Sequence, residues 1–178
     1  MKVAKRRRRE AKTDYQKRIK LLKSGFPRVV FRKTNRYIIT QYVSSKEAQD
    51  KIDFGINSKE LLKYGWPKEA QGSLKSISAS YLTGFLMGRK IIGKKLKKPL
   101  VDLGMIKTIH KTKVYAFIKG LIDGGIEIKC KKEAFPSEER IKGGHLKNKI
   151  DFQKIKSQIE KLDEKVFLSQ KFGEKKKK

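Results

Sequence analysis

The chain has 178 residues, enough for one compact domain with a core of its own and extensions beyond it. Its 47 Lys and Arg residues against 18 Asp and Glu give a formal net charge of +29. A single cysteine excludes an internal disulfide. We expect no secretory signal, because the N-terminus has no apolar segment, and no membrane span, because the longest uncharged run (76–88) is short and polar. Such a charge makes a compact chain repel itself, so we expect a polyanionic partner.

The positive charge is spread along the whole chain and is densest at its start. Residues 1–36 hold 15 basic and 2 acidic residues. Residues 37–100 hold 12 basic and 5 acidic residues, and residues 101–178 hold 20 basic and 11 acidic residues. A solvated charged face would explain one such run but not three. Because neutralised phosphates release counterions and so drive binding, nucleic acid is the leading partner.

The N-terminal region is predicted to be a basic arm followed by a short helix. Residues 1–12 should be extended, because the consecutive cations Lys5 to Arg9 repel one another and have no apolar stripe to bury. The folded core is expected over 13–128. Its first helix should have Thr13 as N-cap, run through Leu22 and end before Pro27.

Period-two alternation then predicts three antiparallel strands. The first begins at Arg28 and has Val29 and Phe31 on one face, and a turn over 33–36 leads to a second strand over 37–43. After a polar loop over 44–49, a third strand covers 52–56. One face of this meander should be buried and the other free to meet a partner.

The middle of the chain is predicted to be mostly helical. Ser58 should cap a helix that ends at Gly65. A longer helix over 76–92 should bury a stripe made of Ile77, Tyr81, Phe85 and Ile92, and its Gly84 and Gly88 allow another element to approach closely.

A buried strand over 100–104 and a helix over 114–122 follow. The predicted fold is therefore α/β, a mixed sheet (antiparallel three-stranded meander plus parallel pairing) with packed helices and basic N- and C-terminal extensions.

The C-terminal part divides into three segments. Residues 129–150 show no period and are predicted to form a surface loop region, although Ser137 followed by Glu138 and Glu139 fits a helix start. An amphipathic helix is expected over 151–168, and 169–178 should be a basic tail ending in four lysines.

Catalytic and metal-binding residues are not indicated. Gly84 and Gly88 have the wrong spacing for a phosphate loop and lie inside an apolar helix. The only histidines, His110 and His145, stand apart, and with Cys130 alone there is no zinc ligand set. We therefore expect no enzyme activity, no cofactor and no metal.

Aromatic residues are interleaved with the densest cations, where they could stack on unpaired bases. Core packing is the alternative for each of them, most strongly for Phe31 by its place in the alternation. The five are Tyr15, Phe26, Phe31, Tyr37 and Tyr42.

Several sequence blocks in a fixed order resemble archaeal-type 5S rRNA-binding proteins of the large ribosomal subunit, universal family eighteen, whose eukaryotic relatives are traditionally numbered five. The blocks span about 5–165 and are Arg7 to Tyr15, Leu21 to Gly25, Pro27 to Ile39, Glu60 to Trp66, Ala79 to Gly84, Val114 to Gly120, Asp123 to Gly125 and Phe135 to Gly143.

The resemblance implies a fold of the translation-machinery-component type and a cytoplasmic, non-enzymatic protein of the central protuberance. Its implied partners are 5S rRNA, 23S rRNA and neighbouring ribosomal proteins. The RNA-binding residues it implies are Arg6, Arg7, Arg8, Arg9, Lys12, Tyr15, Arg18, Arg28, Arg32, Lys33, Asn35 and Arg36. The lysine-rich stretch 105–113 departs from the family pattern and suggests further phosphate contacts.

Two other hypotheses remain open. A non-specific nucleic-acid compacting or RNA chaperone protein would explain the charge but not the ordered blocks. An RNA-processing enzyme would need a catalytic set that the sequence does not offer.

Overall fold

The computed structural model describes residues 3–47, 49–144 and 150–161. The elements in chain order are α1 (Arg6–Arg9), α2 (Tyr15–Lys23), β1 (Arg28–Lys33), β2 (Ile38–Lys46), β3 (Gln49–Asn57), η1 (Ser58–Tyr64), η2 (Lys68–Ser73), α3 (Ile77–Gly93), β4 (Leu100–Asp102), α4 (Lys113–Asp123), η3 (Lys132–Ala134), α5 (Glu138–Lys142) and a helix over 152–161. None of the helices in the described segments is long and apolar enough to cross a membrane.

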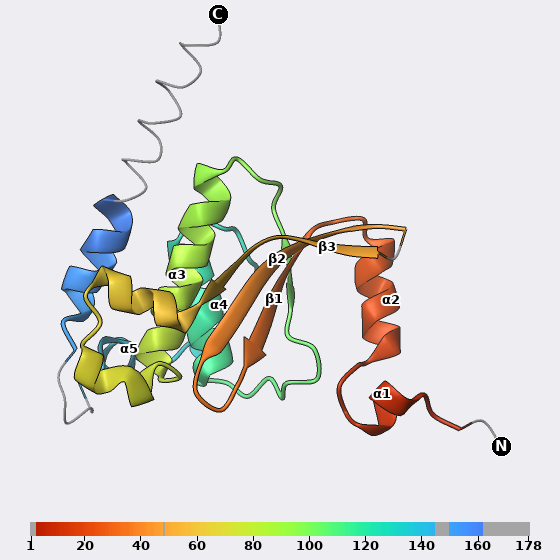
Figure 1. Cartoon of the computed structure of the whole chain (residues 1–178), viewed down its shortest axis with the longest axis horizontal. Coiled ribbons are helices and arrows are strands. Elements are labelled where there is room, and N and C mark those ends of the chain that lie inside the picture. Colours follow the sequence, from red (N-terminus) through yellow and green to blue (C-terminus); the bar gives the residue numbers. More distant parts are fainter. Residues whose placement is uncertain (1–2, 48, 145–149, 162–178) are drawn as a thin grey trace, which may run out of the picture.

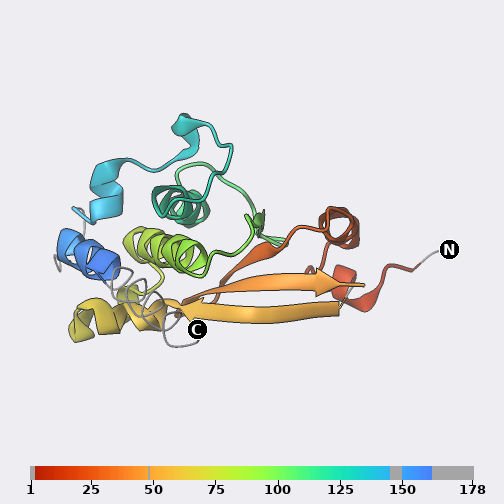
Figure 2. The ribbon, with the colours of Figure 1, turned by 90° about the horizontal axis from the view of Figure 1, so that it is seen from above.

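The four strands form one mixed sheet in the order β3-β2-β1-β4. The β1–β2 and β2–β3 pairs are antiparallel, whereas β1 and β4 are parallel. Helices α3 and α4 lie side by side over one face of the sheet, while α1 and α2 stand at the opposite end of the molecule from α5 (Figures 1 and 2). The prediction of an α/β fold with a mixed sheet and packed helices is confirmed.

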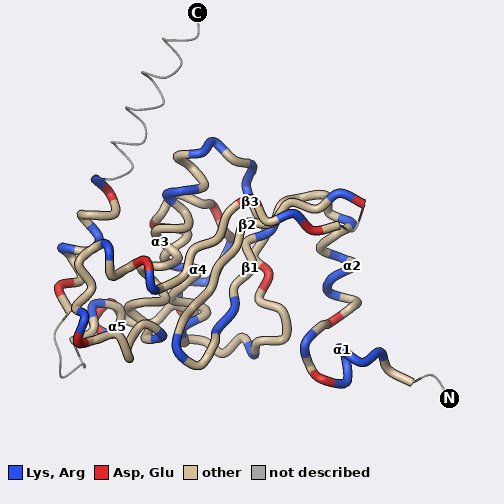
Figure 3. The backbone as a smooth tube through the Cα atoms, in the orientation of Figure 1, with Lys and Arg blue, Asp and Glu red and all other residues tan. Residues whose placement is uncertain are grey.

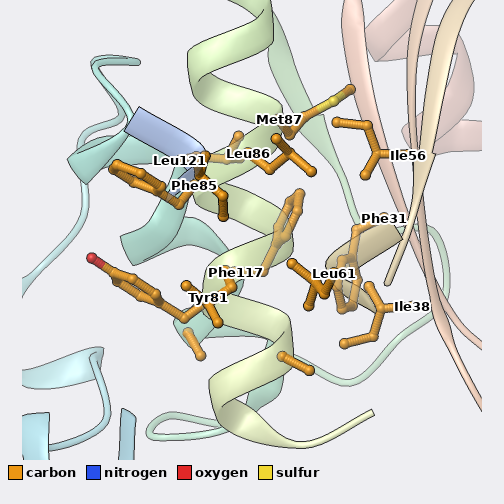
Figure 4. Close-up of a cluster of buried hydrophobic side chains, with 14 of the residues drawn as sticks. Phe31, Ile38, Ile56, Leu61, Tyr81, Phe85, Leu86, Met87, Phe117 and Leu121 are labelled. Atoms are coloured by element: carbon orange, nitrogen blue, oxygen red, sulfur yellow. The ribbon is translucent and has the colours of Figure 1, made fainter. Parts of the chain in front are cut away.

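The core lies between this sheet face and α3. Val29 and Phe31 of β1 are fully buried, as their alternation predicted, and the Phe31 ring centroid is 4.7 Å from that of Phe117 on α4 (Figure 4). Every residue of α3 from Ser78 to Gly88 is buried. The predicted single apolar stripe was therefore too narrow, because α3 contacts the sheet, α4 and the C-terminal helix, while Ile92 is 40% exposed.

Glycines permit the close crossing of α3 and α4. A Cβ atom on Gly84 would collide with the backbone carbonyl of Phe117, and one on Gly120 would collide with that of Tyr81. The close approach predicted from Gly84 and Gly88 is thus confirmed, and Gly120 on α4 and Gly124 at the C-cap of α4 complete it from the other side.

The β2–β3 connection differs from the prediction. Instead of a polar loop over 44–49, β2 continues to Lys46 and β3 begins at Gln49, with Glu47 in the left-handed region at φ +50°. The segment over 44–49 contains no Gly or Pro, the residues that usually mark a tight turn between two strands. A register shift between Tyr42 and Val43 pairs Val43 with Ile52, which is 54% exposed rather than on a buried face.

The segment after β3 consists of two 3-10 helices. The N-cap of η1 is Asn57, whose side chain accepts from the Lys59 N–H, and not Ser58 as predicted. Ser58 is buried, and its hydroxyl oxygen accepts a hydrogen bond from the Ile38 N–H at 3.1 Å. The second short helix, η2, was not predicted, because its sequence has no helical period.

The C-terminal region packs on the core through short helices. Helix α5 starts after Ser137, as the two glutamates suggested, and buries Ile141. Phe152, Ile155 and Ile159 are buried on the 152–161 helix, which agrees with the predicted amphipathic pattern. The rest of that predicted helix and the tail over 169–178 lie outside the described residues.

Candidate nucleic-acid interface

Within the basic arm, residues Arg6–Arg9 form a single helical turn, whereas the arm was predicted to be extended. The Lys5 carbonyl accepts hydrogen bonds from the Arg8 and Arg9 N–H groups, which closes α1. Glu10 lies 3.5 Å from the Arg6 guanidinium and reduces the repulsion on which the extended prediction rested. All four arginines of α1 are exposed. Figure 3 shows the basic positions of this turn in blue, at the end of the molecule where the N-terminus lies.

Helix α2 begins with an aspartate cap. The Asp14 carboxylate accepts from the N–H groups of Gln16 and Lys17, so Asp14 and not Thr13 is the N-cap. The hydrogen bond from the Lys17 N–H, helped by the nearby Arg8, lowers the pKa of Asp14. Tyr15 follows with the Lys5 ammonium 4.8 Å from its ring centroid.

No residue of α2 is buried, so polar contacts hold this helix against the sheet. The Arg18 guanidinium lies 2.8 Å from an Asp50 carboxylate oxygen, and the Lys17 ammonium donates to the Gly104 carbonyl at 3.4 Å. These contacts join the helix to the start of β3 and to the end of β4.

Asp50 belongs to a chain of alternating charges that runs through the sheet. Its second carboxylate oxygen lies 2.6 Å from the Arg28 guanidinium and accepts from the Ser45 hydroxyl at 2.8 Å. Arg28 and Arg32 each lie 3.6 Å from the Asp102 carboxylate. We call this set, Arg18, Asp50, Arg28, Asp102 and Arg32, the ion-pair chain.

The structure corrects the expectation for Arg28. Its side chain is 2% exposed, so its guanidinium neutralises two carboxylates inside the protein and does not face a surface partner. Partial burial of Asp50 removes water from its carboxylate and by itself would raise the pKa. The hydrogen bonds from Ser45 and Arg18 and the charge of Arg28 have the larger combined effect, so the pKa of Asp50 is lowered. The lowered pKa favours the charged carboxylate that pairs with Arg18 and Arg28.

Four of the predicted RNA-binding residues meet at one pocket of about 140 Å³. Arg7, Lys12, Arg18 and Arg32 line it from the arm, α2 and β1, together with the carboxylates of Asp14 and Asp102. The arm and the sheet thus form one surface, which the sequence order alone did not show.

Three further predicted residues lie at the β1–β2 turn, while Arg6, Arg8, Arg9 and Tyr15 lie on α1 and α2. Lys33, Asn35 and Arg36 are exposed there, and the turn is closed by the Thr34 N–H donating to the Tyr37 carbonyl at 2.9 Å. These three do not line the pocket between the arm and the sheet, so the predicted residues other than the buried Arg28 lie on two parts of the surface, the arm side and the turn.

The aromatic candidates divide between surface and core. Phe31 and Tyr42 are buried, and the Tyr42 hydroxyl donates to the Lys97 carbonyl, so both serve packing. Phe26 is 57% exposed, whereas Tyr15 and Tyr37 are half-buried and each carries a lysine ammonium over its ring. Of the five candidates, these three are the ones whose rings remain accessible.

Sequence reasoning missed Asp50 and Asp102, the carboxylates that organise the cations. Acidic residues are scarce in residues 1–102, with 8 against 27 basic residues, and this scarcity was the one signal that each could have a specific basic partner. In the part of the chain that the structure describes, no three or more His, Cys, Asp and Glu side chains lie together as a metal-ion site would require.

Comparisons with known proteins find similarity to large-subunit ribosomal proteins. A family described as ribosomal large subunit proteins 60S L5 and 50S L18 matches residues 1–99. A protein named large ribosomal subunit protein uL18 from Korarchaeum cryptofilum is 41% identical over 173 residues, 97% of this chain and 82% of the relative.

Two further relatives carry the same name. The one from Methanoregula boonei is 41% identical over 144 residues, which are 81% of this chain and 80% of the relative. The one from Methanococcoides burtonii is 36% identical over 165 residues, 93% of each chain.

The fold and its cationic surface are those of an RNA-binding structural protein. The chain belongs to the family of large-subunit ribosomal proteins that includes 60S L5 and 50S L18, which confirms the resemblance found in the sequence.

Proposed function

We propose that this protein binds 5S rRNA and attaches it to 23S rRNA in the central protuberance of the large ribosomal subunit. The coarser role follows from family membership: a structural constituent of the large subunit, located in the cytoplasm as part of the ribosome, with rRNA and ribosomal proteins as partners. The finer assignment to 5S rRNA rests on the resemblance and on the cationic surface.

The main observation behind the proposal is that cations of the arm, of α2 and of the sheet line one pocket. The pocket between them has five cationic side chains and two carboxylates, because Lys17 joins the four predicted cations there. Three of these five pair with carboxylates, Arg18 and Arg32 within the ion-pair chain and Lys12 with Glu10. The structure gives Arg7 and Lys17 no ion pair among the described residues. The excess positive charge at a defined place suits phosphate groups held in a fixed arrangement.

The exposed cations are proposed to neutralise phosphates, and the ordered surface to select RNA shape. Arg6 to Arg9, Lys12, Tyr15 and Arg18 would act from the arm and α2, with Arg32 beside them. Lys33, Asn35 and Arg36 would act from the β1–β2 turn. Arg28 is left out of the contacting set because it is buried, and its role is to hold Asp50 and Asp102 in place.

The test is binding to purified 5S rRNA and to a random RNA of equal length, titrated from about 50 to 300 mM salt, the range over which the phosphate contribution collapses. We expect the preference for 5S rRNA to persist at the upper end. Equal binding of both RNAs that disappears with salt would contradict the proposal and favour a non-specific compacting or chaperone protein, which the net charge of +29 alone would also explain.

A further inference from the structure

A second cationic pocket lies away from the arm, between the β4–α4 loop and the β1–β2 turn. Its volume is about 750 Å³, within the usual range of small-ligand sites. It is lined by residues 106, 107 and 109–114 of the loop and the start of α4, together with Phe31, Lys33, Ile77 and Arg140, and we call it the loop pocket. In Figure 1 the loop runs from β4 along the lower edge of the sheet to the start of α4, near the β1–β2 turn.

The rim of the loop pocket carries only positive formal charge. Five cationic side chains line it, and no carboxylate does; they are Lys33, Lys107, Lys111, Lys113 and Arg140. None of the five makes an ion pair with a carboxylate among the residues that the structure describes. Burial, and then the positive charges of Lys33 and Lys75, lower the pKa of Lys113. The cations therefore repel one another, and a bound anion would relieve this repulsion.

The floor of the same pocket is apolar. Phe31 and Val114 are buried at its back, Ile77 and Ile106 are half-buried, and Ile109 is 60% exposed. An inorganic phosphate or an acidic peptide would use the rim but leave the accessible isoleucines of the floor, Ile77, Ile106 and Ile109, in contact with water. A nucleobase with its attached phosphates would cover the floor and neutralise the rim together.

The backbone holds the rim in place before any ligand binds. The Lys111 N–H donates to the Ala134 carbonyl at 2.8 Å, and the Lys113 carbonyl accepts from the Ser80 hydroxyl at 2.6 Å. The Thr112 hydroxyl donates to the Ile109 carbonyl at 2.7 Å. Lys111 itself has φ +58°, a conformation that is unfavourable for a residue with a side chain. Such fixed geometry lowers the ordering cost of binding.

We propose that the loop pocket binds an unpaired ribonucleotide of rRNA, with the base on the apolar floor and the adjoining phosphates on the lysine and arginine rim. This inference rests on the proposed RNA-binding function but assigns a separate site. The nucleotide can come from 5S rRNA or from 23S rRNA, and the experiment below distinguishes the two sources.

The first experiment measures binding of a fluorescent single-stranded oligonucleotide and of its blunt duplex to the full chain carrying Arg6–Arg9→Ala, so that the arm contributes little. Ile109→Ser should weaken single-strand binding about fivefold, as expected for a small apolar contact, and leave the salt slope unchanged. Lys111→Gln should lower the salt slope by about one. Duplex binding should not respond to Ile109→Ser.

Matched controls keep this result interpretable. Ile52→Ser changes an isoleucine on β3 that is 54% exposed, against 60% for Ile109, and should not affect binding. Lys129→Gln removes an exposed cation that is not part of the loop pocket and should change binding less than Lys111→Gln. Thermal unfolding of each variant checks that the fold is kept.

The second experiment crosslinks 4-thiouridine-substituted 5S rRNA and, separately, 23S rRNA to the unmodified full chain. We expect crosslinks within 106–114 from one of the two RNAs, which identifies the source. Single-strand binding that is insensitive to Ile109→Ser would overturn the proposal, as would an acidic hexapeptide that competes better than the oligonucleotide. If crosslinks appear at 106–114 but the protein shows no preference for 5S rRNA over random RNA in the salt titration, only the proposed 5S rRNA function would be overturned. The proposed nucleotide site would stand.

Discussion

Burial decides which arginine can reach a polyanion. Arg28 and Arg32 lie on the same strand four residues apart, yet the side chain of Arg28 is 2% exposed and that of Arg32 is 45% exposed. Both share the Asp102 carboxylate. A buried cation without its carboxylates would carry a large desolvation cost, so Arg28 and its two partners have to be considered together.

Asp50→Asn is expected to destabilise the protein. The change leaves the buried Arg28 with Asp102 and Ser45 as partners and removes the ionic contact to Arg18. We expect a loss of about 1–3 kcal/mol in the free energy of unfolding, the usual cost of a buried donor that loses its partner. Urea unfolding followed by circular dichroism measures it. Asp53→Asn on the same strand is the control, and an equal effect from both would contradict a specific role for Asp50.

The stabilisation from Asp50 should depend on pH in a defined direction. Its pKa is lowered in the folded state, so its contribution is fully present above the ordinary aspartate pKa of about 4 and is lost as pH falls below that value. The difference in unfolding free energy between the unmodified protein and Asp50→Asn should therefore be constant from pH 5 to 7 and shrink below about pH 4. Urea titrations at each pH measure it, and a difference that grows on acidification would refute the assignment.

At the scale of elements, the α3–α4 crossing depends on glycines that face backbone. A methyl group on Gly120 would overlap the Tyr81 carbonyl, and a backbone atom cannot move aside as a flexible side chain can. We expect Gly120→Ala to cost about 3 kcal/mol, the upper part of the overpacking range, measured by chemical unfolding. Gly93→Ala on α3 is the control, because nothing lies within 4 Å of its added Cβ, and it should stay within about 1 kcal/mol of the unmodified protein.

The arm is expected to contribute binding without contributing stability. Helix α1 buries no residue, so replacing Arg6 to Arg9 with Ala should leave the melting temperature unchanged. The logarithmic salt slope for 5S rRNA should fall by up to about four, near one for each lost phosphate contact. Fluorescence titrations at several salt concentrations give the slope. An unchanged slope would remove the arm from the interface.

At the scale of the whole molecule, periodic apolar patterns predicted the fold well, and contacts distant in sequence escaped prediction. The alternation around Phe31 and the helices over Ile77–Gly93 and Lys113–Asp123 are local signals, and the structure agrees with them. The burial of Arg28 depends on Asp50 and Asp102, which lie 22 and 74 positions away in the chain. The cations of the arm were recognisable from composition, but their meeting with Arg32 required the tertiary structure.

The net charge of +29 should make the stability of the free protein depend on ionic strength. Repulsion among exposed cations acts over a Debye length of about 30 Å at 0.01 M salt and about 10 Å at 0.1 M. Raising NaCl across this range should therefore stabilise the fold by about 1 kcal/mol, which corresponds to 2–4 °C in the melting temperature of a chain of this size. Scanning calorimetry measures the shift.

Two opposing electrostatic contributions decide the sign of this salt effect. Screening weakens net repulsion, which stabilises the fold, but it also weakens exposed pairs such as Arg18–Asp50, whereas the buried Arg28 contacts are screened little. Replacing four exposed lysines, Lys23, Lys46, Lys68 and Lys131, with Gln lowers the net charge and should flatten the salt response. A melting temperature that falls with salt would mean that the ion pairs outweigh the repulsion. The expected rise instead means that the free chain carries excess positive charge which rRNA phosphates can neutralise, so binding and folding stability should increase together.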